Sequence, residues 1–249
     1  MNKESGSWVA GAHQRARQPK QKEQRRESIL AAATELFLSQ PQQLPTAAQI
    51  AQRCGLAKGT LYLYFDSKEA IYLSLLEQAI AGWFERVQRE LRRPQVEGLE
   101  ALVELLLSCQ LQPLLLPLAS LTLTLENGLG NHDLLAYRTR QKQRFKQTAE
   151  AIQQYCRTTT SNLSSRSAAV HSALPPLWQS YAQLIGLWQV TQTPTQLARV
   201  RQSPVNLSSA VNFDESSKCV LTLIWQSWLQ AGPDKSQKPG LVQQLFGRR

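Results

Sequence analysis

Hydroxyl groups and positive charges are concentrated in one short stretch of the sequence, between Lys58 and Lys68. Besides these lysines, the stretch carries Thr60, Tyr62 and Tyr64. Such side chains donate hydrogen bonds, and lysine adds a positive charge. A stretch of this kind suits contact with the phosphates and the base edges of a nucleic acid.

The elements that must position these groups are short helices. Residues 25–39 repeat apolar residues at three- and four-residue spacing, which predicts a first helix that ends before Pro41. Thr46 and Gln49 have the spacing of a capping box, in which each side chain satisfies a free backbone amide at a helix start. This pair predicts a second helix over residues 46–53.

A third helix is expected over residues 57–65, after a sharp turn at Gly55. Gly59 lacks a Cβ, so the backbone can approach a phosphate closely there. With Leu61 and Phe65 directed inward, the other side chains face outward: Lys58, Thr60, Tyr62, Leu63 and Tyr64. Three helices joined in this way form a helix-turn-helix unit, whose last helix fits the major groove of DNA.

Charge and composition agree with this interpretation. The 249 residues include 28 Lys and Arg against 18 Asp and Glu, which gives a net charge of +10. Such a charge favours a nucleic acid first and an anionic membrane second. The 42% of hydrophobic residues and 18% of charged residues indicate a globular chain with a substantial core.

Patterns of catalytic and metal sites are missing from the sequence. There is no GxSxG, no phosphate-binding glycine-rich loop and no HExxH, and the neighbours His132 and Asp133 would not face each other on a helix. The cysteines are dispersed without a CxxC pair, at Cys54, Cys109, Cys156 and Cys219. We therefore expect no enzymatic activity, no cofactor and no metal site.

The cellular location is predicted from two segments. The N-terminal residues lack the apolar stretch of a secretory signal, which predicts a cytoplasmic protein. Residues 105–125 carry no charge over a length that suits a membrane span, but Pro113 and Pro117 interrupt them. Buried helices of a core are favoured over a membrane span, so no membrane partner is expected.

Residues 56–69, with the sequence LAKGTLYLYFDSKE, resemble the signature of the TetR family of transcriptional regulators. The match runs over residues 25–75 or so, and the remainder matches only as a helical pattern. The resemblance implies an all-α fold with an N-terminal three-helix helix-turn-helix DNA-binding domain and a larger helical C-terminal effector-binding and dimerisation domain. It further implies a homodimer that binds double-stranded DNA at a palindromic operator, usually as a repressor, and that a small-molecule effector releases.

The resemblance also assigns roles to residues. Thr60, Tyr64 and Lys68 match phosphate-contacting positions, and Thr46 matches a contact at the start of the second helix. The positions that can face base edges are Lys58, Tyr62 and Leu63. Ala57 stands at the start of the third helix without a capping oxygen.

The expected domains follow from these elements: residues 1–24 as a flexible basic arm, 25–68 as the DNA-binding domain, 69–232 as the effector-binding and dimerisation domain, and 233–249 as a C-terminal tail. Loops are expected at 158–167 and 193–217. The basic arm either keeps the chain in solution or follows the minor groove of DNA.

Two ligand surfaces are expected in the C-terminal domain. A cavity for the effector is placed among helices over residues 96–157, near Cys109 and Gln110. Dimerisation is assigned to helices over residues 175–190 and 217–230, through Trp178, Tyr181, Ile185, Trp188, Val220, Ile224 and Trp228.

An alternative function keeps the fold but dispenses with a small ligand. In it the chain is a DNA-bound adaptor or architectural protein that recruits a protein partner. The basic residues 138–146 or the loop 193–217 would bind that partner, although a solvated helix face is the default interpretation of the first.

Overall fold

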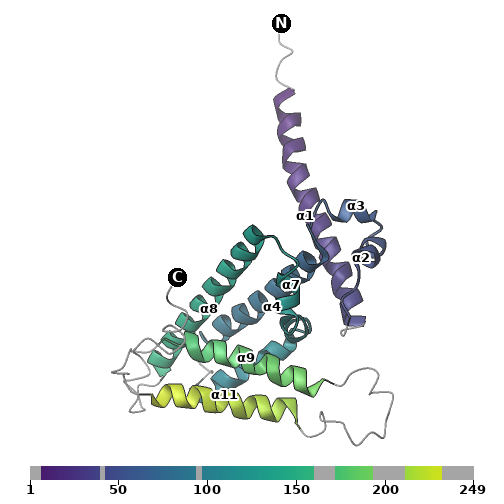
Figure 1. The fold of residues 1–249 in the computed structure, drawn as a ribbon. Helices are drawn as coiled ribbons and strands as arrows, with labels where there is room; N and C mark the ends of the chain where they lie inside the picture. Colours follow the sequence, from purple (N-terminus) through teal and green to yellow (C-terminus); the bar gives the residue numbers. More distant parts are fainter. Residues whose placement is uncertain (1–6, 40–42, 94–96, 160–171, 193–210, 232–249) are drawn as a thin grey trace, which may run out of the picture.

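The structure is a computed structural model that describes residues 7–39, 43–93, 97–159, 172–192 and 211–231, and of residues 7–19 only the backbone. All regular structure in these ranges is helical (Figure 1), as the sequence predicts. Most of the expected loops, at 160–167 and 193–210, and the tail at 233–249 lie outside the described residues.

The first helix, α1, spans Ser7–Ser39 and is much longer than predicted. Residues 7–24, for which the sequence predicts a flexible arm, form its N-terminal part and project away from the rest of the molecule (Figure 1). Most of these residues are Ala, Gln, Arg or Lys, which favour helix even without an apolar face, although Gly11 and Pro19 do not. Burial begins further on, since Ile29, Ala33 and Phe37 have no exposed surface.

The head of the molecule comprises residues 20–66. It contains α1 from residue 20 onward, α2 (Ala47–Arg53) and α3 (Lys58–Leu61). Its small core combines Phe37 with Ile50 and Leu61, all fully buried. The connecting helix α4 (Lys68–Glu90) seals this core from below, where its Tyr72 donates a hydrogen bond to the Pro45 carbonyl over 3.3 Å. Helix α4 then continues into the rest of the molecule without a linker (Figure 1).

The body, which comprises the described residues from 97 onward, packs around α4. It contains α5 (Gly98–Leu107), the short 3-10 helix η1 (Ser108–Leu111), α6 (Leu115–Ala119), α7 (Thr122–Glu126), α8 (Asn131–Thr159), α9 (Leu174–Thr191) and α11 (Phe213–Gln230). Prolines and short helices break the uncharged segment 105–125, as expected for a core. Among the described residues we find no helix with both the length and the apolar character that crossing a bilayer requires.

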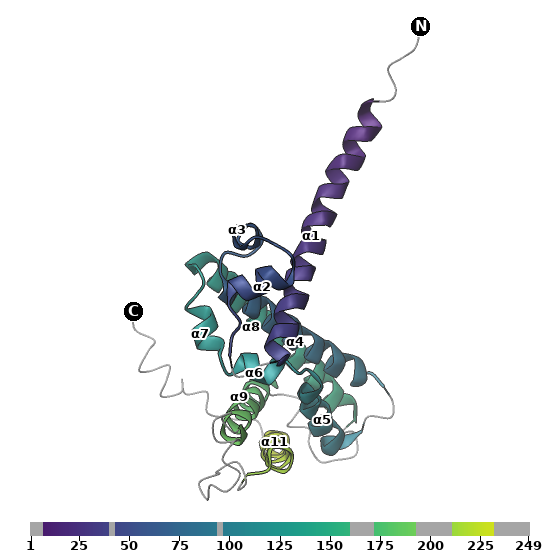
Figure 2. The ribbon, with the colours of Figure 1, turned by 90° about the vertical axis from the view of Figure 1, so that its right-hand side faces the viewer.

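Helices α9 and α11 lie side by side at the edge of the body (Figures 1 and 2). Trp225 of α11 is fully buried between them and donates a hydrogen bond to Ser180 Oγ of α9 over 2.9 Å. The side chain of Asn212 accepts hydrogen bonds from the Asp214 and Glu215 amides, so α11 begins at Phe213, inside the loop that the sequence predicts up to residue 217.

Candidate nucleic-acid interface

The start of α2 has the predicted capping box. The Gln49 amide donates to Thr46 Oγ1 over 3.3 Å, and the Thr46 amide donates to Gln49 Oε1 over 2.8 Å. The Thr46 hydroxyl also donates to Gln49 Oε1, so its proton is used inside the cap. A DNA contact by Thr46 therefore stays a prediction, and it would require this hydroxyl to turn away from Gln49.

The turn into α3 depends on Gly55, whose φ of 67° lies in the left-handed region that favours glycine. Helix α3 ends at Leu61, earlier than the predicted limit of 65, and tighter turns follow. In them the Leu63 amide donates to the Thr60 carbonyl and the Tyr64 amide to the Leu61 carbonyl. No side-chain bond caps the helix at Ala57, as the sequence predicts.

Leu61 and Phe65 are buried as predicted, and the side chains expected to face outward differ in exposure. Leu61 is 0% and Phe65 is 3% exposed, whereas Tyr62 is 41% and Leu63 is 73% exposed. We call the outward face of this unit the recognition surface; its exposed members are Lys58, Gly59, Tyr62 and Leu63. Thr60, Tyr64 and Lys68 lie at its margin and are partly buried.

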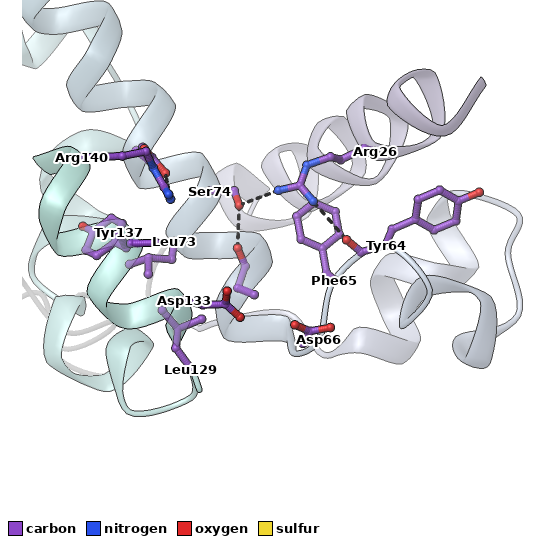
Figure 3. A pocket seen from close by; sticks show the side chains of 13 residues that line it. Arg26, Tyr64, Phe65, Asp66, Leu73, Ser74, Leu129, Asp133, Tyr137 and Arg140 are labelled. Carbon is purple, nitrogen blue, oxygen red and sulfur yellow. Dashed lines mark hydrogen bonds and ion pairs between the residues drawn. The ribbon is translucent and has the colours of Figure 1, made fainter. Parts of the chain in front are cut away.

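Arg26 holds this unit in place, a role that the sequence did not reveal. Its guanidinium donates to the Tyr64 carbonyl over 3.1 Å and to Ser74 Oγ of α4 over 3.3 Å (Figure 3). It also lies 4.0 Å from the centre of the Phe65 ring, in a cation–π arrangement. One side chain of α1 thereby joins the end of the recognition unit, which comprises α3 and the turns after it (residues 58–65), to the connecting helix α4.

Head and body meet around a pocket of about 220 Å³, which we call the junction pocket (Figure 3). Its walls carry charges of both signs. On the α8 side, Arg140 donates two hydrogen bonds to the Glu77 carboxylate, over 2.6 and 3.0 Å, and this contact raises the pKa of Arg140. The other residues that line the junction pocket include Arg26, Phe65, Asp66, Leu129, Asp133 and Tyr137.

Beside this pocket, the start of α4 touches the loop before α8 directly. Ser67 Oγ accepts a hydrogen bond from the Ala70 amide and donates one to the Gly128 carbonyl, over 3.1 and 3.0 Å. A Cβ added at Gly128 would lie 2.4 Å from Cγ of Glu69, well inside contact distance. Glycine is therefore required here by the close approach of two segments far apart in sequence.

We expect the substitution Gly128→Ala to destabilise the chain by about 1–3 kcal/mol, because the new methyl group must push the start of α4 away from the loop. Urea unfolding followed by circular dichroism measures the change. Gly130→Ala is the matched control, since a Cβ there meets no atom within 4 Å. Equal unfolding midpoints for the two variants would contradict the close contact.

The residues predicted to bind an effector do not face the same way. Cys109 is fully buried, whereas Gln110 is exposed, and neither lines the junction pocket. Burial raises the pKa of the Cys109 thiol to about 12, and a hydrogen bond from the Gln110 backbone opposes that rise only in part. An effector site at these residues stays a prediction. In the described part of the chain, no group of His, Cys, Asp or Glu side chains is arranged to hold a metal.

The residues predicted for dimerisation lie at different depths on α9 and α11. Tyr181 and Trp228 are buried within the chain, while Trp178 stacks on Phe145 with ring centres 3.7 Å apart and remains 39% exposed. The others are partly buried: Ile185, Trp188, Val220 and Ile224. Val190 and Leu223 are not among the predicted residues, although each is 60% exposed.

The basic residues 138–146 are engaged mainly with carboxylates of α4 and of the body. Arg138 pairs with the buried Glu126 at 2.5 Å, and Arg140 and Arg144 both pair with Glu77. Lys146 lies 3.9 Å from Glu150, one helical turn further along α8. Carboxylates of the same chain therefore neutralise much of the positive charge on this face of α8.

Two family patterns match the sequence. One, described as "Bacterial regulatory proteins, tetR family", matches residues 29–75, and the other, described as "Tetracyclin repressor-like, C-terminal domain", matches residues 77–230. The boundary between them falls inside α4. Together they cover the head from residue 29 onward and nearly all of the described body.

Individual relatives match over shorter stretches. The Fatty acid metabolism regulator protein of Bacillus subtilis (strain 168) is 33% identical over 73 residues, which are 29% of this chain and 38% of that protein. The HTH-type transcriptional regulator HbdR of Aromatoleum sp. (strain CIB) is 35% identical over 86 residues, which are 34% of this chain and 35% of the relative. The chain thus spans little more than a third of the length of these curated relatives.

Among solved structures, the transcriptional regulator FadR from Bacillus subtilis, in complex with stearoyl-CoA, is similar with a TM-score of 0.48. The sequence identity is 16%, and the similarity covers 79% of this chain and 97% of that chain.

Proposed function

The chain belongs to the TetR family of bacterial regulatory proteins, and from this membership we propose that it is a sequence-specific DNA-binding transcriptional regulator. The observation that carries the proposal is the recognition surface. The head packs its core so that Tyr62 and Leu63 stay exposed beside Lys58. A hydroxyl, an apolar group and a cation on one convex surface suit base edges, thymine methyl groups and phosphates in a major groove.

The proposed contacts divide into two kinds. Lys58, Tyr62 and Leu63 read base edges, because they stand furthest from the core. Phosphates are bound by Thr46 at the start of α2 and by the three residues at the margin, which fix the register of the head: Thr60, Tyr64 and Lys68. Gly59, where an added Cβ would meet nothing in the protein, lets the backbone approach the DNA.

A homodimer is proposed to present two heads to a palindromic operator. Val220, Leu223 and Ile224 form a continuous apolar stripe on α11 at helical spacing, and Leu223 is 60% exposed. Ile185 and Trp188 of α9 are partly buried and extend the set of apolar groups available for pairing. Two heads related by a twofold axis read half-sites one helical turn apart or a multiple of it.

Release by a small effector is supported by polar atoms in the core that α4 shares with the body. Within the described residues, Glu126 Oε1, Gln141 Oε1 and Trp83 Nε1 are buried and have no hydrogen-bond partner. Each such group costs about 1–3 kcal/mol when left unpaired, so an effector that supplies partners gains that energy. We propose that the chain is a repressor, and that such an effector changes how the body holds the heads.

Thermal melting against a library of small molecules tests this part of the proposal. A ligand that binds the folded chain raises the melting temperature, and Glu126→Gln should weaken that rise for compounds that carry donors. If no compound raises the melting temperature, the proposal of a small effector is wrong. That result would favour the alternative function, a DNA-bound adaptor without a small ligand.

The decisive experiment for the function is selection of bound duplexes from a random DNA pool at near-physiological salt, followed by sequencing. A near-palindromic consensus supports a dimeric, sequence-specific regulator and reports the spacing of its half-sites. Enrichment without any consensus would show that charge alone binds DNA, and the proposal would fail.

Two substitutions should distinguish the recognition of bases from the binding of phosphates. We expect Lys68→Ala to weaken binding to all duplexes alike and to lower the salt slope by about one unit, because it removes one phosphate contact. Tyr62→Ala should instead change the preferred bases, because it removes a group from the reading face. Binding isotherms at several salt concentrations and repeated selection measure both. Unchanged affinity and preference in both variants would contradict the assignment.

A further inference from the structure

A second groove runs between α1 and the recognition unit, and we call it the α1 groove. It is an open cleft of about 850 Å³. Its walls are Gln21, Lys22, Gln24, Arg25 and Ser28 on α1 and Leu63 and Tyr64 on the recognition unit. Leu63 and Tyr64 belong to both surfaces, so the groove continues the recognition surface without a break.

The α1 groove has a positive lining. Lys22 and Arg25 are exposed, and none of the lining residues is acidic. The nearby acids of α1, Glu23 and Glu27, are exposed and do not line the groove. In the described part of the chain, no carboxylate forms an ion pair with either Lys22 or Arg25.

The direction of α1 determines where Lys22 and Arg25 would lie relative to bound DNA. The helix passes beside α2 and continues beyond α3, away from the body (Figure 2). A major groove that holds the recognition unit is bordered by phosphates on both sides. Side chains beside that unit, at the level of Leu63 and Tyr64, therefore meet a sugar–phosphate backbone.

We propose that the α1 groove is a second DNA site, in which Lys22 and Arg25 bind backbone phosphates at the flank of each operator half-site. This inference rests on the proposed DNA-binding function. The site adds affinity and orients the head but carries no base preference, because phosphates are the same at every base pair. Because of this site, the chain needs a duplex that extends beyond the bases that it recognises.

The test compares two double variants of the full chain that lose the same charge. Lys22→Gln with Arg25→Gln removes the proposed contacts and keeps good helix-forming residues. Lys142→Gln with Lys146→Gln removes two exposed lysines from α8 in the body and is the control. Binding is measured between 50 and 200 mM salt on the selected operator, with and without flanking base pairs, and circular dichroism checks the fold.

Each lost phosphate contact lowers the salt slope by about 0.9, so two contacts make the parent affinity fall about tenfold more than that of the α1 variant over this fourfold range of salt. We expect this difference on the flanked duplex only, with the same consensus in a repeated selection. The control variant should behave as the parent.

Three results would overturn the proposal: equal salt slopes for the α1 variant and the parent, an equal loss in the control, or a changed consensus. Failure of the function itself has a different signature, because then the parent chain selects no consensus and there is no operator on which to compare the variants.

Discussion

Phe65→Ala is expected to lower the free energy of unfolding by about 3–5 kcal/mol and to abolish specific DNA binding. The Phe65 ring is 3% exposed, closes the core of the head and carries the Arg26 guanidinium on its face. Removing it leaves a cavity and takes away the surface that orients Arg26. Because a core as small as that of the head has little stability to spare, the recognition surface should lose its shape.

Leu63→Ala is the matched control for Phe65→Ala, two residues away. Leu63 is 73% exposed, so its loss should change stability by no more than about 0.5 kcal/mol. Denaturant unfolding, measured on both variants, gives the comparison of stability, and binding of Phe65→Ala to the selected operator is compared with that of the parent chain. If Phe65→Ala unfolds at the same denaturant concentration as Leu63→Ala, the described core of the head is wrong.

The second large effect is expected from Trp225→Ala, again with a loss of about 3–5 kcal/mol. Trp225 has no exposed surface, donates its indole hydrogen to Ser180 Oγ, and packs edge to face against Trp228 with ring centres 5.5 Å apart. The cavity left by alanine loosens α9 from α11. Since these helices carry the proposed dimer surface, the variant should also dissociate at concentrations at which the parent chain stays dimeric.

Urea unfolding measures the first effect of Trp225→Ala, and analytical ultracentrifugation over a range of concentrations measures the second. Gln226→Ala changes the next residue of α11, which is exposed, and should leave the stability as it is. A Trp225→Ala chain that is as stable as Gln226→Ala would contradict the packing of these helices.

The local features of the head are those that the sequence predicts best. The capping box needs only Thr46 and Gln49, three positions apart, and the turn needs only the free φ of Gly55. The inward direction of Leu61 and Phe65 follows from their spacing of one helical turn. Each of these signals lies within a few residues and is decided by backbone geometry alone.

Features that depend on distant partners are absent from such local patterns. Arg26 contacts residues 38 and 48 positions away, and Ser67 contacts Gly128 across 61 positions. Arg26 is one of many arginines in the sequence, and no local pattern marks Gly128 as a point of contact. The length of α1 was underestimated for another reason, because a projecting helix needs helix-forming residues but no apolar stripe.

The contact at Gly128 sets a rule for building hybrid regulators from this chain. A hybrid that takes residues up to Asp66 from another protein keeps Ser67, Glu69 and Gly128 together, so the complementary surfaces are inherited as a set. A hybrid joined further along, after Leu75, keeps the glycine but receives foreign residues at positions 67 and 69. The exchangeable unit therefore ends before α4 begins, although the helix itself runs on unbroken into the body.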